Sequence, residues 1–417
     1  MDADTLDLAR TQFALTAATH FLFVGLTLGL ATLVTYAQTR ATFSRSPVHE
    51  RMVRFWGQLY VINYAVGIVT GLVMELQLGL NWGGLGHFAG NVFGSSLALE
   101  TLTAFFVEST FLGLWIFGWG RLTRWAHLAV IWVVTLTGYA SAYWIMVSNG
   151  FLQHPAGATV VDGVLRLTDA AAVLTNPSAV VGFGHVLAAS LLTGGLVMAG
   201  ASAYHLRREP SELFLRSLRI GLGAALLALP ATVYLGSLHF GVVDDTQPLK
   251  AAVSDGDTAK IAQLQGEAAV AFGTGDYTPS AFWANALDVM MGSWVVMTAV
   301  VLVGLTIRRK SPSTARKRLL LVMAGIPLPF VALVSGWVYR ETGRQPWTVY
   351  GLLRTRDAVS DLSPATLTAS LVTFTVLFAA LAAVNCWLLA RCARRGPDDV
   401  ALGAPAEDPE PVPAPTF

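Results

Sequence analysis

The stretch FGSSLALETLTAFFVESTFLGLWIFGW, residues 93–119, decides the class of fold. It holds only two charged side chains, Glu100 and Glu108, among apolar and small residues. An apolar run of about 20 residues crosses a bilayer as an α-helix, because a helix satisfies its own backbone hydrogen bonds where lipid offers none. We therefore predict a membrane-spanning helix at Ser96–Trp119, with two carboxyl groups inside the bilayer.

The composition of the whole chain agrees with this prediction. Of 417 residues, 54% are hydrophobic and 13% are charged, about half of the roughly 25% charged residues that soluble proteins carry. With 27 Lys+Arg against 26 Asp+Glu, the chain has no basic face for nucleic acid, and two cysteines cannot form a disulfide framework. We expect an all-α integral membrane protein surrounded by membrane lipid, with no nucleic-acid partner.

Apolar runs long enough to span a bilayer occur nine times. The acidic start MDADTLDLAR and the length of the first run indicate a retained helix rather than a signal peptide. The nine predicted spans are Leu15–Tyr36, Trp56–Leu78, Ser96–Trp119, His127–Ser148, Ser178–Tyr204, Ile220–Leu238, Phe282–Ile307, Leu319–Val338 and Leu367–Ala390.

The basic residues predict how these spans are oriented. Nine spans leave the two termini on opposite sides, and 19 of the 27 Lys+Arg fall on the side of the C-terminus. By the positive-inside rule, the N-terminus is outside and the C-terminus is cytoplasmic. The outer loop 340–356 is an exception because it carries four arginines, which suggests an anionic partner there.

The predicted domain organisation is simple. Residues 1–395 form one nine-helix transmembrane domain, with two long outer segments at 239–281 and 339–366. Residues 396–417 are rich in proline and acidic residues, a composition that predicts a disordered cytoplasmic tail.

Ionisable side chains inside membrane spans are costly, so each one is a functional hypothesis. Imidazole nitrogen and thioether sulfur together ligate low-spin haem iron, whereas a carboxylate or a lone histidine can hold a high-spin iron. From the residues alone, a membrane histidine can equally bridge two helices, and methionine is commonly core filler. The candidates are His20, Glu75, Glu100, Glu108, His185, Asp288, Met290, Met291, Glu341 and Arg344. The other histidines, His239 among them, are interpreted as surface or membrane-belt residues.

Several long motifs carry a resemblance to one family, subunit I of cytochrome bd-type quinol oxidases. They follow the family order from the first span to the loop before the last. Besides residues 93–119, the matching stretches are RTQFALTAATHFLFVGLTLG (10–29), GLVMELQLGLNW (71–82), SAYWIMVSNGFLQHPAG (141–157), FGHVLAASLLTGG (183–195) and ETGRQPWTVYGLLRT (341–355).

The resemblance implies two haems b and one haem d, or a third haem b in its place. His185 matches the histidine of the low-spin haem, and Met290 best matches its methionine partner, with Met291 as the alternative. His20 matches the ligand of one high-spin haem, and Glu341 matches the ligand of the other. Which of these two is haem d stays open, with His20 favoured.

Other residues match supporting positions of the family. Glu100 and Glu108 match paired glutamates, and they suit a path that carries protons from the cytoplasm to the oxygen site. Arg10 and Arg344 are predicted to pair with haem propionates, as guanidinium groups pair with carboxylates. Trp337 is interpreted either as a neighbour of the porphyrin or as an aromatic-belt residue.

The loop between the sixth and seventh predicted spans matches the family's quinol site only in part. Lys250 follows Gln-Pro-Leu, as in the family pattern, but Asp255 stands where the family has a glutamate. Asp288 stands close to a family arginine. The surrounding loop looks little like its relatives, so the electron donor is an open question at this point.

These observations predict the haem-bearing subunit of a terminal respiratory oxidase in a bacterial plasma membrane. It would oxidise quinol at the outer face, reduce dioxygen to water with cytoplasmic protons, and require a smaller subunit II. One alternative is a divergent bd-like oxidoreductase with another donor. A transporter or proton channel without haem would leave the match of His185, Met290 and Glu341 unexplained.

Overall fold

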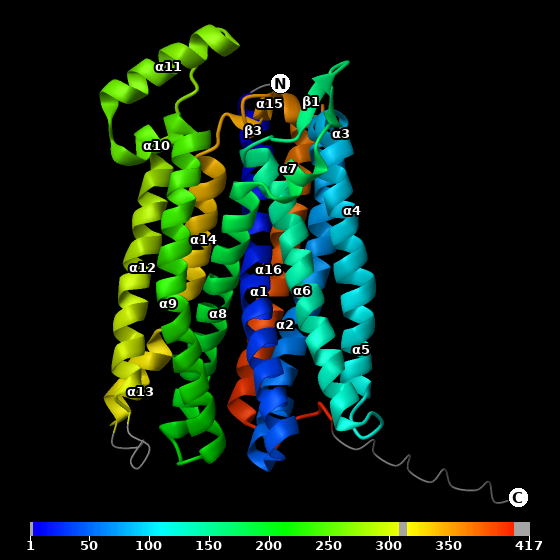
Figure 1. Ribbon diagram of the computed structural model, residues 1–417, viewed down its shortest axis with the longest axis vertical. Coiled ribbons are helices and arrows are strands. Elements are labelled where there is room, and N and C mark those ends of the chain that lie inside the picture. The colour runs from blue at the N-terminus through cyan, green and yellow to red at the C-terminus, as the bar shows by residue number, and fades with distance from the viewer. Residues whose placement is uncertain (1–2, 308–314, 404–417) are drawn as a thin grey trace, which may run out of the picture.

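The computed structural model describes residues 3–307 and 315–403. In these residues, nine helical segments are long and apolar enough to cross a membrane, which confirms the predicted number of spans and the all-α class. The segments run side by side in one elongated bundle, with the first residues of α1 at one end (Figure 1).

Most of the helices extend beyond the predicted apolar runs, because a helix can continue past the hydrocarbon layer. The third and seventh spans instead end two residues before the predicted runs, at Phe117 and Leu305. The bounds of the helices are α1 (Ala3–Ser44), α2 (Pro47–Asn81), α6 (Arg124–Gln153), α8 (Pro177–Leu206), α9 (Glu212–Thr246), α12 (Phe282–Leu305), α13 (Arg316–Ala324), α14 (Leu328–Thr342) and α16 (Pro364–Arg395). A short helix, α7 (Ala170–Leu174), leads into α8, and α13 with α14 forms the eighth span.

The third span is not a uniform α-helix. It consists of α3 (Gly83–Ala89), η1 (Gly90–Gly94), α4 (Ser95–Thr101), η2 (Leu102–Glu108) and α5 (Ser109–Phe117), of which η1 and η2 are π-helical. Wider π turns are rare and often occur at functional sites. The apolar pattern predicts a plain helix here, because hydrophobicity does not encode a shift of the backbone hydrogen-bond ladder.

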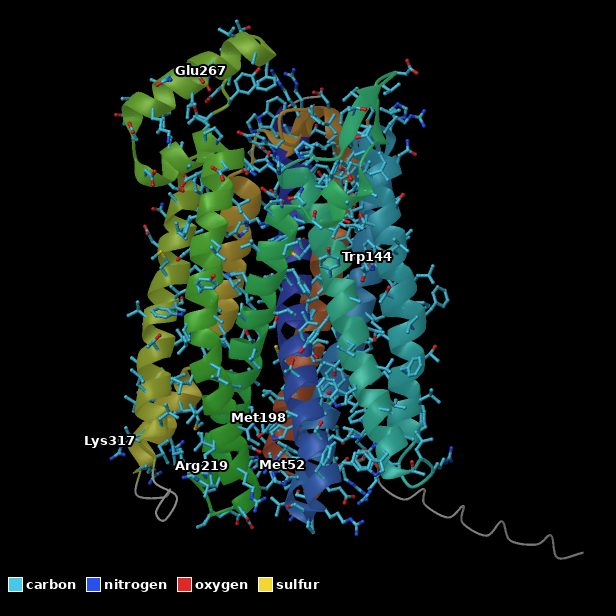
Figure 2. All side chains as sticks on the ribbon, viewed as in Figure 1. Met52, Trp144, Met198, Arg219, Glu267 and Lys317 are labelled. Carbon is cyan, nitrogen blue, oxygen red and sulfur yellow. The ribbon has the colours of Figure 1, made fainter. Side chains whose placement is uncertain are left out.

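The small elements gather at the end of the bundle where α1 begins (Figure 1). They are the antiparallel pair β1 (Ala158–Val161) and β2 (Val164–Leu167), the helices α10 (Pro248–Asp255) and α11 (Thr258–Phe272), the pair β3 (Trp347–Val349) and β4 (Leu353–Arg354), and α15 (Thr355–Ala358). Glu267 of α11 lies at this end, whereas Arg219 and Lys317 lie at the other (Figure 2). The predicted orientation across the membrane stays a prediction.

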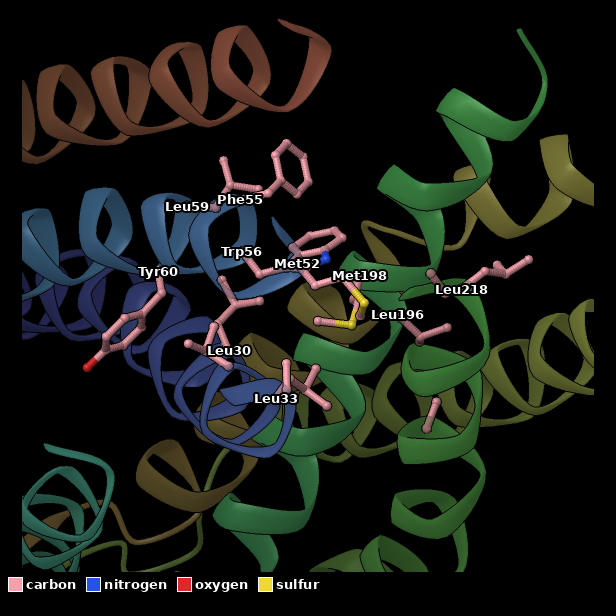
Figure 3. Close-up of a cluster of buried hydrophobic side chains, with 14 of the residues drawn as sticks. Leu30, Leu33, Met52, Phe55, Trp56, Leu59, Tyr60, Leu196, Met198 and Leu218 are labelled. Carbon is pink, nitrogen blue, oxygen red and sulfur yellow. The ribbon is translucent and has the colours of Figure 1, made fainter. Parts of the chain in front are cut away.

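The main apolar core joins α1, α2, α8 and α9. Trp56 is fully buried, and its indole Nε1 donates a hydrogen bond to Oγ of Ser217 over 2.9 Å. Met52 and Met198 point toward one another in the same cluster (Figure 3). Other members include Leu30, Leu33, Tyr60, Leu196 and Leu218. This core holds together the helices that carry two of the four candidate ligands, His20 on α1 and His185 on α8.

Residues 396–403 turn back along α2. The backbone N–H of Ala401 donates to Oε1 of Gln58 over 2.7 Å, and Arg54 donates to the carbonyl of Gly403 over 2.7 Å. The rest of the predicted tail, residues 404–417, lies outside the described residues, so its disorder stays a prediction.

The crossing of α1 and α8 depends on glycine. A Cβ on Gly29 would lie 2.1 Å from the carbonyl oxygen of Ser190, and a Cβ on Gly194 would lie 2.6 Å from the carbonyl carbon of Gly29. Both obstacles are backbone atoms, so a methyl group could be accommodated only by moving the helices apart.

We predict that Gly29→Ala lowers the free energy of unfolding by roughly 1–3 kcal/mol, the usual cost of overpacking. Thermal unfolding of the purified protein in detergent measures this. Gly223→Ala is the matched control, because its Cβ would meet no atom within 4 Å. Equal melting temperatures for the two variants would contradict the prediction.

Candidate functional site

A cavity of about 490 Å³ lies between α8, α9, α12 and α14, a size within the range of cofactor pockets. His185 from α8 and Met290 from α12 both line it, and most of its wall is apolar. Met291 also lines the cavity but is 54% exposed, whereas Met290 is half-buried. The structure thus brings the predicted histidine and methionine to one cavity.

Two glycines lie beside these side chains. A Cβ on Gly336 of α14 would lie 2.8 Å from the sulfur of Met290, and a Cβ on Gly236 of α9 would lie 3.4 Å from Cε1 of His185. The absent side chain of Gly336 makes room for the thioether, whereas a methyl group on Gly236 would make only an ordinary contact with the imidazole. The donor set and the space therefore fit a haem with one histidine and one methionine ligand.

Arg340 joins four segments at the wall of this cavity. Its Nε donates to Oδ1 of Asn149 over 2.5 Å, its Nη1 donates to Nε2 of His239 over 2.7 Å, and its Nη2 donates to Ser178. The interpretation of His239 as a belt residue misses this contact. The sequence does contain a signal for this contact, because His239 stands at the outer end of a predicted span and Arg340 begins the arginine-rich outer loop.

Glu341 is held by three donors. Its Oε1 accepts from Asn149 over 2.7 Å and from Gln153 over 3.2 Å, and its Oε2 accepts from Arg344 over 2.5 Å. Arg344 is 5% exposed, and its Nε and Nη1 have no hydrogen-bond partner among the described residues. Burial lowers the pKa of the Arg344 guanidinium. Two unmatched donor nitrogens on a buried cation fit an anionic group such as a propionate.

His20 lies at a separate position, on α1 facing α2. Its Nδ1 is 2.9 Å from Oγ1 of Thr70. It does not line the cavity of His185, although the next residue, Phe21, does, together with Trp337. The rings of Phe21 and Trp337 pack with centroids 5.4 Å apart, so an aromatic pair in the wall of this cavity includes the residue next to His20.

The glutamates of the third span lie against α2 and α6. Glu100 accepts a hydrogen bond from Ser141 over 2.7 Å, and it also hydrogen-bonds Glu75, which accepts from Thr101 over 2.5 Å. Glu108 is 4% exposed and abuts Gly138, where a Cβ would lie 3.0 Å from its Oε1. The neighbours of Glu100 are thus Ser141 and Glu75, and its functional pairing with Glu108 stays a prediction.

Lys250 is buried although it belongs to the small helix α10. It is 2% exposed, its Nζ donates to the carbonyl of Arg340 over 3.2 Å, and the ring of Tyr339 lies 4.7 Å away. Burial, together with the nearby charge of Arg340, lowers the pKa of Lys250 from 10.5 to about 7. Its amine therefore exchanges a proton readily near neutral pH.

A second cavity, of about 210 Å³, lies between α10, α11 and the β3–β4 segment. Lys250 lines both cavities, and the second also has walls from Glu267, Trp347 and Tyr277. Asp255 is exposed at the end of α10 and lines neither cavity.

The remaining predicted residues lie at the periphery. Asp288 is exposed on α12. Arg10 forms a 3.4 Å ion pair with exposed Asp7, while its buried Nε has no hydrogen-bond partner among the described residues.

Comparison with known proteins gives a consistent result. The family model described as "Cytochrome bd terminal oxidase subunit I" matches residues 8–278 and 261–397. The chain is 35% identical to cytochrome bd ubiquinol oxidase subunit 1 of Bacillus subtilis (strain 168), over 94% of each chain. It is 30% identical to cytochrome bd-II ubiquinol oxidase subunit 1 of Escherichia coli (strain K12), over 97% of this chain and 99% of the relative.

A solved structure agrees with these sequence matches. It is the bd oxidase from Geobacillus thermodenitrificans, which matches with a TM-score of 0.83 and 26% identity. The match covers 94% of this chain and 99% of that chain.

We predict that Lys250→Met changes how stability depends on pH. The unfolded chain binds the Lys250 proton more tightly than the folded chain, so wild-type stability rises with pH between about 7 and 10.5. The stability of the methionine variant should not show this rise. The variant should exceed wild type most below pH 7, where wild type must bury a charged amine. Thermal unfolding across this pH range measures it, with exposed Lys260→Met as the control. Parallel curves for wild type and Lys250→Met would refute the prediction.

Proposed function

Because the chain belongs to the cytochrome bd terminal oxidase subunit I family and is a quinol:oxygen oxidoreductase, we propose its cofactors, donor and proton source. It carries two haems b and one haem d, or a third haem b. It oxidises quinol at the outer face of a bacterial plasma membrane and reduces dioxygen to water with protons from the cytoplasm. When bound, the haems supply electron transfer and oxygen reduction.

The observation that carries this proposal is the 490 Å³ cavity lined by both His185 and Met290. A nitrogen and a sulfur donor on different helices suit the two faces of a low-spin haem. Gly336 leaves space beside the thioether of Met290. Arg340 in the same wall supplies positive charge for the propionates of this group.

His20 and Glu341 are proposed to hold the two high-spin haems. Glu341 has lone pairs beyond those used by Asn149, Gln153 and Arg344, because a carboxylate offers about four acceptor sites. The unmatched N–H groups of Arg344, and the buried Nε of Arg10, support the expected pairing with propionates. Trp337 packs beside Phe21 at the cavity that holds His185.

Quinol is proposed to bind in the second cavity. Lys250 lines both this cavity and the cavity of His185 and Met290. Oxidation of a quinol requires a base for its hydroxyl proton. Lys250 suits that role because its lowered pKa leaves much of the amine neutral near pH 7. Glu267 lines this cavity and Asp255 does not, so Glu267 is the better placed carboxylate to pass the proton to water.

Glu108 and Glu100 are proposed to carry protons toward the oxygen site. Both lie within a membrane span, where carboxyl groups are retained mainly for function. Glu100 has the hydroxyl of Ser141 and the carboxyl of Glu75 as neighbours that can pass a proton on. Glu108 is buried against α6 and has no cation among its hydrogen-bond or ion-pair partners in the described residues.

A smaller subunit II is the proposed partner. Leu102 and Phe106 of η2 are 57% and 60% exposed, and only 12% of the apolar window of the third span is buried within the chain. An apolar face of this kind is covered by a second subunit or by membrane lipid.

One observation favours a different electron donor. Asp255, the acid expected in the quinol loop, lies outside both cavities. A divergent bd-like oxidoreductase with another outer-side donor would keep the haem residues and dispense with this acid.

Oxygen consumption by the assembled oxidase with a soluble quinol tests the donor. We predict quinol-dependent oxygen uptake that Lys250→Met slows by about 10²-fold or more, the range expected for loss of a general base. Lys260→Met should match wild type. Haem that is reduced by dithionite but not by quinol would favour the alternative donor.

We also predict that Gly336→Ala disturbs the low-spin haem. A methyl group would lie 2.8 Å from the sulfur of Met290 and would push the thioether aside. The absorption band of the low-spin haem should change to a high-spin form, with the other haem bands retained. Gly223→Ala on α9, which does not line the cavity and where a Cβ would meet no atom within 4 Å, is the control. An unchanged low-spin band in Gly336→Ala would contradict this prediction.

A further inference from the structure

His20 belongs to a ladder of polar contacts between α1 and α2. The α2 side of the ladder is Asn63, Thr70 and Gln77, spaced by seven residues. Gln77 accepts from Thr16 over 2.7 Å, and Asn63 donates to the carbonyl of Phe23 over 2.8 Å. The contact between His20 and Thr70 lies between these two, so the register of the helices is set on both sides of it.

The proton of Thr70 is already committed. Thr70 is fully buried, and its hydroxyl lies 2.8 Å from the carbonyl oxygen of Gly67 and 3.0 Å from that of Val66. A hydroxyl has one proton and a carbonyl can only accept. With the Thr70 proton donated to its own helix, the Thr70 oxygen accepts from His20, and we infer that Nδ1 of His20 carries the proton in the 2.9 Å contact.

This assignment sets the tautomer of the imidazole. With the proton on Nδ1, Nε2 holds the free lone pair that a metal requires. Gly71, the residue after Thr70 on α2, leaves space for the ring, because a Cβ there would lie 3.2 Å from Cε1.

We propose that Thr70 and Gly71 are positioning residues for His20: the hydroxyl fixes the tautomer that presents Nε2 to a haem iron, and the glycine leaves room for the ring. The inference rests on the proposed function, because it requires His20 to be a haem ligand. A hydrogen bond accepted from Nδ1–H also makes the imidazole a stronger donor to the metal. Its loss weakens the bond between iron and histidine.

The test compares Thr70→Val, which keeps the shape but removes the hydroxyl, with Thr70→Ser, which keeps the hydroxyl. The matched control is Thr193→Val, because Thr193 is equally buried and, among the described residues, its hydroxyl bonds only to the carbonyl of Ala189. Each assembled oxidase is examined by resonance Raman spectroscopy for the iron–histidine stretching band and by haem-to-protein ratio. The absorption band of the low-spin haem reports correct assembly.

Thr70→Val is expected to lower the frequency of the iron–histidine band and to weaken retention of that haem by roughly 10- to 100-fold, the usual effect of losing such a partner. Thr70→Ser should restore both, and Thr193→Val should match wild type. An unchanged band and unchanged retention in Thr70→Val would overturn the inference, as would a loss of every haem that serine does not restore. If wild type itself binds haem but gives no iron–histidine band, the assignment of His20 fails; if it binds no haem, the proposed function fails with it.

Discussion

Lipid offers no hydrogen-bond partners, and this constraint accounts for the placement of most polar side chains in the bundle. Threonine hydroxyls bond to carbonyl groups of their own helix, and asparagine and glutamine side chains bond across helices, as Asn63 does to Phe23. Because these polar side chains are hydrogen-bonded, the buried polar atoms that lack a hydrogen-bond partner among the described residues require an explanation. The Nε and Nη1 of Arg344 are the clearest case among the described residues, because a buried cation with free N–H groups is costly unless an anion completes it.

The same constraint explains why the candidate site is divided among several helices. His20 lies on α1 against α2, the His185 cavity lies between α8, α9, α12 and α14, and Glu341 lies in the last turn of α14 against α6. Large planar cofactors need space between helices, and each helix can offer one donor to that space. Lys250, from the small helix α10, lines both the cavity of His185 and Met290 and the second cavity. It therefore lies where a donor site and an electron-transfer site would meet.

The number of spans and the all-α class were predictable from sequence because apolar length is a direct consequence of bilayer thickness. The motifs also identified the family, since they are long and lie in a fixed order. The sequence could not indicate the π-helical segments of the third span, the contact between Arg340 and His239, or the pairing of Glu75 with Glu100. These depend on backbone register and on which helices are neighbours in space, neither of which hydrophobicity reports. The ligand roles of His20, His185, Met290 and Glu341 stay predictions that the geometry supports.

The central claim is that this chain holds haem through His185 and Met290, with high-spin haem beside it. A dithionite-reduced-minus-oxidised absorption spectrum of membranes containing the assembled protein tests it most directly. The account predicts a low-spin haem b band together with high-spin bands, and a red band where haem d is present. A correctly assembled, stable protein without any haem signal would contradict it, and the intramembrane carboxyl groups would then require an explanation without haem.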